Sequence, residues 1–200
     1  MPNIKWIGIL NDDISRYQKG ELDSNAKKMI MPSTMEEMMI KALPFVIVPF
    51  LIIVLSMFIK TFIAQQVVVN PIFVLIGFIL SFLGLYLHEL LHAVVYPSGV
   101  NVYIGIYPKA FAAVALASYP LTRIRFIIMS LIPLILGIVP IIIFCISPID
   151  LRNWNGFWFG LSMMGLISPY PDCYNVSQVL KQTPRGSCIQ VWGDDTFWIE

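Results

Sequence analysis

Four apolar stretches dominate the pattern of hydrophobic and polar positions along this chain. Three of them reach the roughly 20 residues that a helix needs to cross a bilayer. These three lie at about 43–64, 72–97 and 124–146. The fourth, at about 156–171, is shorter and is interrupted by Pro169 and Pro171. The pattern predicts an all-α polytopic membrane protein with about four transmembrane helices.

The segment between the second and third apolar stretches has a different pattern. Residues 100–120 are apolar, but they are punctuated by Gly105, Pro108 and Pro120. These breaks disfavour a helix and favour strands or re-entrant backbone. We therefore expect a short membrane-associated β-like hairpin after the second span. A second pair of short strands is predicted near the end of the chain, on either side of Gly193 in CIQVWGDDTFWIE.

The polar flanks indicate how the chain is organised. We predict a cytoplasmic N-terminal segment over 1–42, a membrane-embedded domain over 43–176 and a cytoplasmic tail over 177–200. Within the first segment, STMEEM predicts a helix start in which Ser33 and Glu36 form a capping box. The first segment has no early apolar core followed by a cleavage site, so we expect insertion through the internal spans rather than a signal peptide.

Composition supports the membrane assignment, and charge placement gives an orientation. Hydrophobic residues make up 58% and charged residues 12% of the chain, with a mean hydropathy of +0.77. Soluble domains carry about twice that charge. The net charge of +1 gives no support for a nucleic-acid partner. Basic residues gather in both polar flanks and after the second span, which places both termini in the cytoplasm. Lys60, near the outer end of the first span, is expected to snorkel to the surface.

The chemistry of the chain is concentrated in the sequence YLHELLHAVVYP. His88 and His92 are four residues apart, so on a helix their imidazoles lie on one face and can bind one Zn²⁺. Glu89 lies one position further, where it can act as general base without being a ligand. These are the only two histidines of the chain. The spacing therefore predicts a zinc site inside an apolar helix.

The helix that carries the motif has a stripe of small residues. Gly77, Ser81, Gly84 and His88 follow one another at intervals of four, three and four. Small residues on one stripe let neighbouring helices approach closely in a membrane. We therefore expect the histidines to face other helices rather than lipid.

A catalytic zinc site needs a third protein ligand and one open position. Asp172 is the expected third ligand, because it and His88 both lie about 24 Å from the outer surface in the predicted topology. Asp150 would lie in an outer link, on the other side of the bilayer, and the terminal acids would require the tail to fold back. Cys173 remains an alternative ligand.

Three stretches carry a resemblance to known families: HELLHAVVYP, YPLTRIRFIIMSLIPLIL and DCYNVSQVLKQTPRGSCIQ. Over about residues 70–190 the chain resembles small bacterial membrane proteins described as zincin peptidases, and beyond them the site-2 protease clan. The resemblance implies a zincin-like membrane domain in the bacterial cell membrane. It also implies His88, His92 and Asp172 as zinc ligands, Glu89 as base, and hydrolysis of peptide bonds in or near the bilayer. The pair Asp172-Cys173 departs from the Asp-Gly that is usual in that clan.

Two classes of function stay open at this point. The first is a membrane zinc metalloendopeptidase in which Glu89 acts on a zinc-activated water. The second is a non-catalytic zinc-binding membrane scaffold or partner-binding protein that retains the zincin fold. An intact Glu89 favours the enzyme, because zinc binding alone does not require it.

For the enzyme, the expected partners are a membrane protein or peptide substrate and the lipid bilayer. A substrate helix must unwind before its backbone can be cleaved, and an extended peptide can then pair with an open strand edge. The segment NVYIGIY is predicted to offer this edge, with Asn101, Tyr103 and Gly105 as substrate-binding residues.

Overall fold

The computed structural model describes residues 1–10, 14–108 and 112–200. The chain divides into two compact units, which we call the sheet unit and the helix unit. The sheet unit comprises Met1–Ala42, Glu89–Ile132 and Pro171–Glu200, and the helix unit comprises Leu43–His88 and Pro133–Tyr170. The boundary falls inside one continuous helix, α3 (Pro71–Val94).

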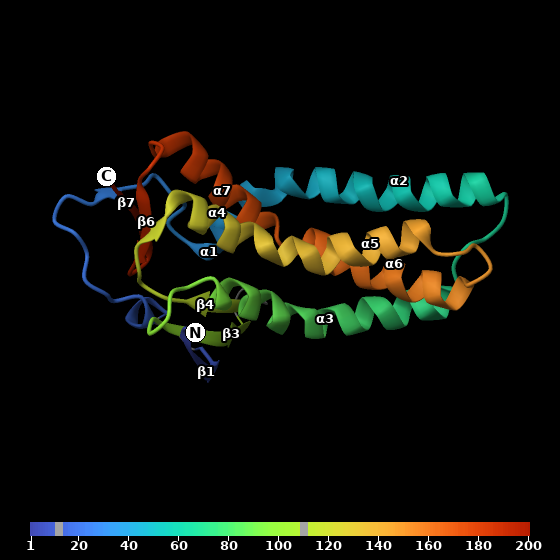
Figure 1. Cartoon of the computed structure of the whole chain (residues 1–200), viewed down its shortest axis with the longest axis horizontal. Coiled ribbons are helices and arrows are strands. Elements are labelled where there is room, and N and C mark those ends of the chain that lie inside the picture. The colour runs from blue at the N-terminus through green and yellow to red at the C-terminus, as the bar shows by residue number, and fades with distance from the viewer. Residues whose placement is uncertain (11–13, 109–111) are drawn as a thin grey trace. The chain divides into compact units, whose positions relative to one another are not determined.

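The helix unit contains the apolar helices. Besides the first part of α3 it holds α2 (Ile47–Ala64), α5 (Ile135–Ile146) and α6 (Arg152–Ile167), and Figure 1 shows α2, α5 and α6 running alongside one another. A short 3₁₀ turn, Leu43–Val46, precedes α2. The hydrophobic core of this unit consists of Ile53, Val68, Ile141, Phe144, Phe159 and Leu166.

Glycines set how closely these helices approach. A Cβ at Gly77 of α3 would lie 2.1 Å from the carbonyl oxygen of Phe157 on α6, and one at Gly160 of α6 would lie 2.1 Å from that of Val74. No side chain larger than hydrogen fits at either place, so the close approach expected at Gly77 is confirmed. At Gly84 no atom lies within 4 Å of the Cβ position.

Three helical segments are long and apolar enough to cross a membrane, judged by length and composition. They are Met35–Ala64, Pro71–Val94 and Arg123–Ile146. The first joins α1 (Met35–Ala42) to α2, and the third joins α4 (Arg123–Leu131) to α5 through a 3₁₀ turn at Ile132–Leu134 that contains Pro133. The fourth predicted span is not confirmed, because α6 has only 16 residues.

The all-α part of the prediction is not confirmed: the chain is mainly helical, but the sheet unit contains two β-sheets. The first has the order β1-β3-β4, with β1 Asn3–Ile9, β3 Asn101–Tyr107 and β4 Ala112–Leu116. β3 and β4 form the antiparallel hairpin expected after the second span. β1 was not foreseen; it pairs in parallel with β3, from Asn3 opposite Asn101 to Ile9 opposite Ile106. The pairing joins positions almost one hundred residues apart, which no local pattern signals.

The second sheet has the order β2-β7-β6-β5 and joins both ends of the chain. Its strands are β2 Lys27–Lys28, β5 Leu121–Thr122, β6 Cys188–Trp192 and β7 Asp195–Ile199. The hairpin predicted around Gly193 is confirmed: β6 and β7 are antiparallel, and Gly193 turns the chain with a φ of +61°. Glycine adopts this left-handed conformation without steric cost.

The helices of the sheet unit are α1, α4 and α7 (Tyr170–Gln182), together with a 3₁₀ turn at Ser15–Tyr17. The capping box of α1 lies one residue later than predicted. Thr34 accepts a hydrogen bond from the backbone N–H of Glu37, whose carboxylate accepts from the N–H of Ser33. The buried core packs strands against helices and includes Ala93, Val102, Ile104, Leu121, Phe126, Val179 and Ile189.

Lys60 does not snorkel to the surface, contrary to the prediction. Only 8% of its surface is exposed. Its ammonium donates to the carbonyl oxygen of Ser147 at 2.8 Å, to Oδ1 of Asn155 at 3.0 Å and to the carbonyl oxygen of Phe144. Phe144 lies in the last turn of α5, Ser147 lies just after that helix, and Asn155 lies on α6. Lys60 therefore caps the open carbonyls of α5 inside the helix unit.

Candidate metal centre

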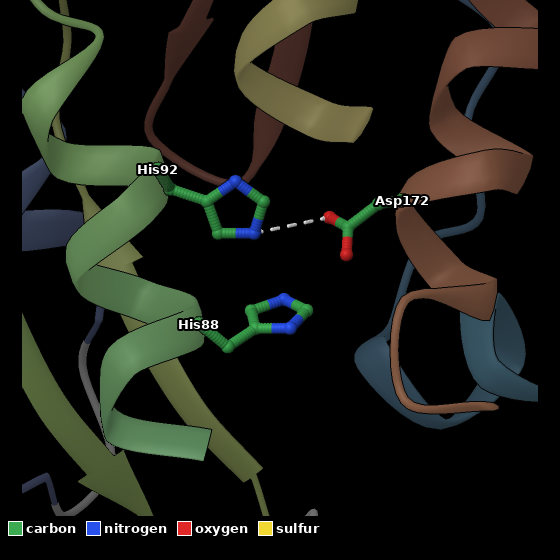
Figure 2. Close-up of side chains that lie close together, drawn as sticks. All are labelled: His88, His92 and Asp172. Carbon is green, nitrogen blue, oxygen red and sulfur yellow. Dashed lines mark ion pairs between the residues drawn. The ribbon is translucent and has the colours of Figure 1, made fainter. Parts of the chain in front are cut away.

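The last turns of α3 carry both histidines on one face. His88 is 6% exposed and His92 is 7% exposed, so both imidazoles are buried. They are one helical turn apart, and Figure 2 shows both rings on the same side of α3, directed toward Asp172.

The orientation of the His92 ring is fixed by α4. Nδ1 of His92 lies 2.7 Å from the carbonyl oxygen of Met129. A carbonyl can only accept, so Nδ1 carries the hydrogen and Nε2 presents its lone pair on the opposite side. A hydrogen bond from the second ring nitrogen is the usual way in which proteins orient a metal-binding histidine. Because the partner is a backbone carbonyl, no side-chain pattern in the sequence could have indicated it.

Asp172 reaches the histidines from the start of α7. The chain breaks after α6 at Ser168 and Pro169, and a new helix begins at Tyr170, which places Asp172 in its first turn. Oδ1 of Asp172 lies 3.5 Å from Nε2 of His92, the pair joined by the dashed line in Figure 2. The helix break expected from the prolines is present, although Asp172 lies on the new helix rather than on irregular backbone.

The donor set fits a zinc ion. One ligand atom from each of His88, His92 and Asp172 lies within 4.8 Å of the other two. Two ligands at about 2.0–2.1 Å from a tetrahedral zinc are about 3.3 Å apart, which is close to the 3.5 Å found between His92 and Asp172. A direct charge-assisted hydrogen bond would be shorter, at about 2.7–2.9 Å. The side chains are thus spaced for an ion between them.

The alternative third ligands do not join this group among the described residues. The group does not include Cys173 or Asp150. Burial raises the pKa of the Cys173 thiol, and the neighbouring Asp172 carboxylate raises that pKa further. Among the described residues, the ligand atoms that lie within 4.8 Å of one another come from His88, His92 and Asp172. Asp172 is therefore the better third donor.

Glu89 lies beside the group and reaches the first sheet. It is 8% exposed, and its carboxylate accepts a hydrogen bond from the backbone N–H of Ala115 on β4. In the sheet order β1-β3-β4, β4 is an edge strand. The side of β4 that does not pair with β3 is therefore the side that faces Glu89.

Two arginines of α4 tie the two helices of the site together. Nε of Arg125 donates to the carbonyl oxygen of Val95 at 2.7 Å, just beyond the end of α3. Arg123 donates to the carbonyl oxygen of Leu180 in the last turn of α7 at 3.1 Å. Thr122 caps α4 by accepting from the N–H of Arg125. The basic residues after the second span, which the sequence suggested only as an orientation signal, thus brace α3 and α7.

The residues predicted to bind substrate lie on β3, which is the central strand of its sheet. Tyr103 pairs with Lys5 on one side and Leu116 on the other. A Cβ at Gly105 would lie 3.0 Å from the carbonyl oxygen of Gly8, so this glycine allows the close approach of β1. Asn101 pairs with Asn3 of β1. Because β3 is paired on both sides, its backbone does not offer the open edge that we expected.

Comparison with known proteins gives one family. The model of a family described as "Putative zincin peptidase" matches residues 81–188, which is more than half of the chain and includes α4, both histidines and Asp172. No curated protein and no solved structure matches the chain.

Proposed function

Since the chain belongs to this zincin peptidase family, we propose that it is a membrane zinc peptidase that hydrolyses peptide bonds in or near the bilayer. The observation that carries the proposal is the spacing of His88, His92 and Asp172 around a buried point, with Glu89 beside them. Three helices long and apolar enough to cross a membrane support the location.

In this proposal His88, His92 and Asp172 hold the ion, and Glu89 moves the proton. Bound zinc supplies a Lewis acid that polarises the scissile carbonyl and increases the acidity of water. Glu89 accepts a proton from the attacking water and delivers it to the leaving amine. The Met129 carbonyl keeps Nδ1 of His92 protonated, so Nε2 remains available as a donor to the ion throughout.

The substrate would bind in extended form along the open edge of β4. Ala115 directs its N–H away from β3 toward Glu89, and alternation along a strand makes Ala113 the next residue with outward backbone groups. A peptide paired at Ala113 would lie next to Glu89, which itself occupies the N–H of Ala115. The edge of β4 thus takes the place of the predicted edge of β3, and the peptide still binds as an added strand.

Four purified proteins test the proposal: wild type, Glu89→Gln, His88→Ala and Asp172→Ala. Zinc content is measured by mass spectrometry of the metal. Hydrolysis is measured on fluorescein-labelled unfolded casein and on a synthetic membrane-spanning peptide. We expect wild type and Glu89→Gln to retain about one zinc per chain and the ligand variants to lose it. Only wild type should cleave.

The scaffold alternative predicts a different result. In that case wild type and Glu89→Gln would still bind zinc and the ligand variants would still lose it. Wild type, however, would cleave no more substrate than Glu89→Gln. A wild-type protein without stoichiometric zinc would exclude both functions. To identify a substrate, Glu89→Gln serves as a trap whose co-purifying proteins are compared with those of His88→Ala.

A further inference from the structure

The helix unit contains a cavity that the proposed peptidase chemistry does not use. Its volume is about 710 Å³, within the range of about 300–1,000 Å³ that is typical of small-molecule sites. Its walls come from the first turn of α3, the link before α6 and the start of α6. They combine three aromatic rings, of Phe73, Trp154 and Phe157, with two charged side chains, of Asp150 and Arg152.

The wall of the cavity at the start of α6 is fastened to the link that precedes α3. The backbone N–H of Asn70 donates to the carbonyl oxygen of Arg152 at 2.9 Å, and Nδ2 of Asn70 donates to Oδ1 of Asn153 at 2.9 Å. The Arg152 guanidinium also donates to Oε1 of Gln66 at 3.2 Å. These hydrogen bonds hold the two links together, so this wall is preformed, as is usual for ligand sites.

The two charges in the cavity are opposite in sign, and neither is neutralised by the protein. In the part of the chain that the structure describes, neither Asp150 nor Arg152 forms an ion pair. The side-chain hydrogen bond of Arg152 goes to a neutral amide oxygen. A guanidinium has five N–H donors, so most of them remain for a ligand. The cavity thus offers a cation and an anion, two residues apart, to one occupant.

The cavity lies where candidate spans end. Phe73 is in the first turn of the candidate span Pro71–Val94, and Asp150 comes shortly after the end of Arg123–Ile146. Polar headgroups flank the apolar core of a bilayer, so the ends of spanning helices lie at their level. Trp154 is 49% exposed, and tryptophan is enriched at this membrane–water interface. Lipid headgroups are therefore the ligands that this cavity would meet.

We propose that the cavity binds the headgroup of a zwitterionic phospholipid, with the phosphate at Arg152 and the ammonium at Asp150. A guanidinium forms strong charge-assisted hydrogen bonds with phosphate oxygens. The faces of Trp154 and Phe157 add an attraction for the ammonium. An anionic headgroup, in contrast, supplies no cation for Asp150. This inference rests on the membrane location in the proposed function, but it does not depend on zinc or on peptide hydrolysis.

The test uses full-length protein in detergent micelles that contain equal amounts of phosphatidylethanolamine and phosphatidylglycerol. Both lipids carry the phosphate and only the first carries an ammonium, so native mass spectrometry should find phosphatidylethanolamine retained over phosphatidylglycerol by about fivefold. Asp150→Asn should remove this preference, and Arg152→Gln should lower the retention of both lipids. The matched controls Asp194→Asn and Arg185→Gln, which remove exposed charges outside the cavity, should behave like wild type.

A further variant gives a result that a misfolded protein cannot produce. Asp150→Arg places two cations in the cavity, so its preference should reverse toward phosphatidylglycerol. Glycerophosphoethanolamine, which is the headgroup without acyl chains, should not displace the retained lipid at equal concentration.

The inference is overturned if wild type retains both lipids equally, or if Asp150→Arg keeps the wild-type preference. Displacement by glycerophosphoethanolamine would also overturn it, because the ligand would then be a soluble molecule. A dimer without retained lipid would do the same, since a second copy of the chain would then cover the cavity. Lipid retention is measured without substrate, so a wild-type protein that lacks zinc would contradict the proposed function and not this inference.

Discussion

The burial of Lys60 gives a prediction that separates two physical descriptions of the helix unit. A lysine that snorkels to the surface contributes little, and replacing it changes stability by less than about 0.5 kcal/mol. In the structure the Lys60 ammonium instead donates to two backbone carbonyls, of Phe144 and Ser147, and to the Asn155 amide oxygen. The substitution Lys60→Met keeps an apolar stem of similar length and removes all of these hydrogen bonds.

The expected loss follows from the acceptors that remain. Each buried acceptor deprived of its donor costs about 1–3 kcal/mol. Lys60→Met removes the ammonium from two backbone carbonyls, whereas the Asn155 oxygen keeps the hydroxyl of Ser147. Two such acceptors give a loss of stability of about 2–6 kcal/mol. The variant also avoids the cost of burying a charged ammonium, which reduces the expected loss. We therefore expect a destabilisation of about 2–4 kcal/mol.

The assay is titration with sodium dodecyl sulfate, followed by fluorescence of Trp154 and Trp158 in α6. Ser56→Ala, one turn earlier on α2, is the control and should change stability by less than about 1 kcal/mol, because its hydroxyl bonds only within its own helix. The Lys60→Met and Asn155→Leu effects should not add in the double variant, since both remove the same contact. A Lys60→Met protein as stable as wild type would refute the capping role.

Further predictions concern the site and its supports. Asp172→Asn should weaken zinc binding by more than about 100-fold in a competition titration with a chelator, whereas Asp150→Asn should not change it. Arg125→Leu should weaken zinc binding about 10–100-fold by freeing the end of α3, with hydrolysis restored at high zinc. Ala113→Pro should lower casein hydrolysis at unchanged zinc content, because proline removes an outward N–H from β4. Gly77→Ala should destabilise the protein by about 1–3 kcal/mol in the detergent titration.

The sequence predicted those features whose cause is local. Four-residue spacing placed both imidazoles on one face of α3, and the apolar runs located the long helices. Asp172, which was selected from the depth of two predicted spans, lies 3.5 Å from His92, although the fourth of the predicted spans is not confirmed. Turn residues predicted both the β3–β4 hairpin and the hairpin around Gly193.

The features that were missed depend on partners distant in the chain. The strand β1 lies in a segment that is polar overall, and it is stabilised by β3, far along the sequence. The acceptors of Lys60 come from residues 144–155, so composition alone favoured a surface position. The Met129 carbonyl that orients His92 belongs to the backbone, which every residue has. Residue type reveals neither the position of this carbonyl nor the position of β4 at the edge of its sheet.

The pairing of the strands limits how many times the chain can pass through a bilayer. Two strands that share hydrogen bonds lie on the same side, so the number of crossings between them must be even. Between β1 and β3 this condition is met if both Met35–Ala64 and Pro71–Val94 cross, as their length and composition allow. Between β5 and β6, however, only Arg123–Ile146 is long enough by itself.

If Arg123–Ile146 crosses, α6 must bring the chain back, even though its 16 residues extend only about 24 Å. A bilayer core is about 30 Å thick, so the short α6 would end inside it. The start of α7, and with it Asp172, would then lie below the surface of the membrane rather than outside it. For the proposed peptidase, the pairing of β5 with β6 would thus be linked to the depth at which a peptide bond is cut.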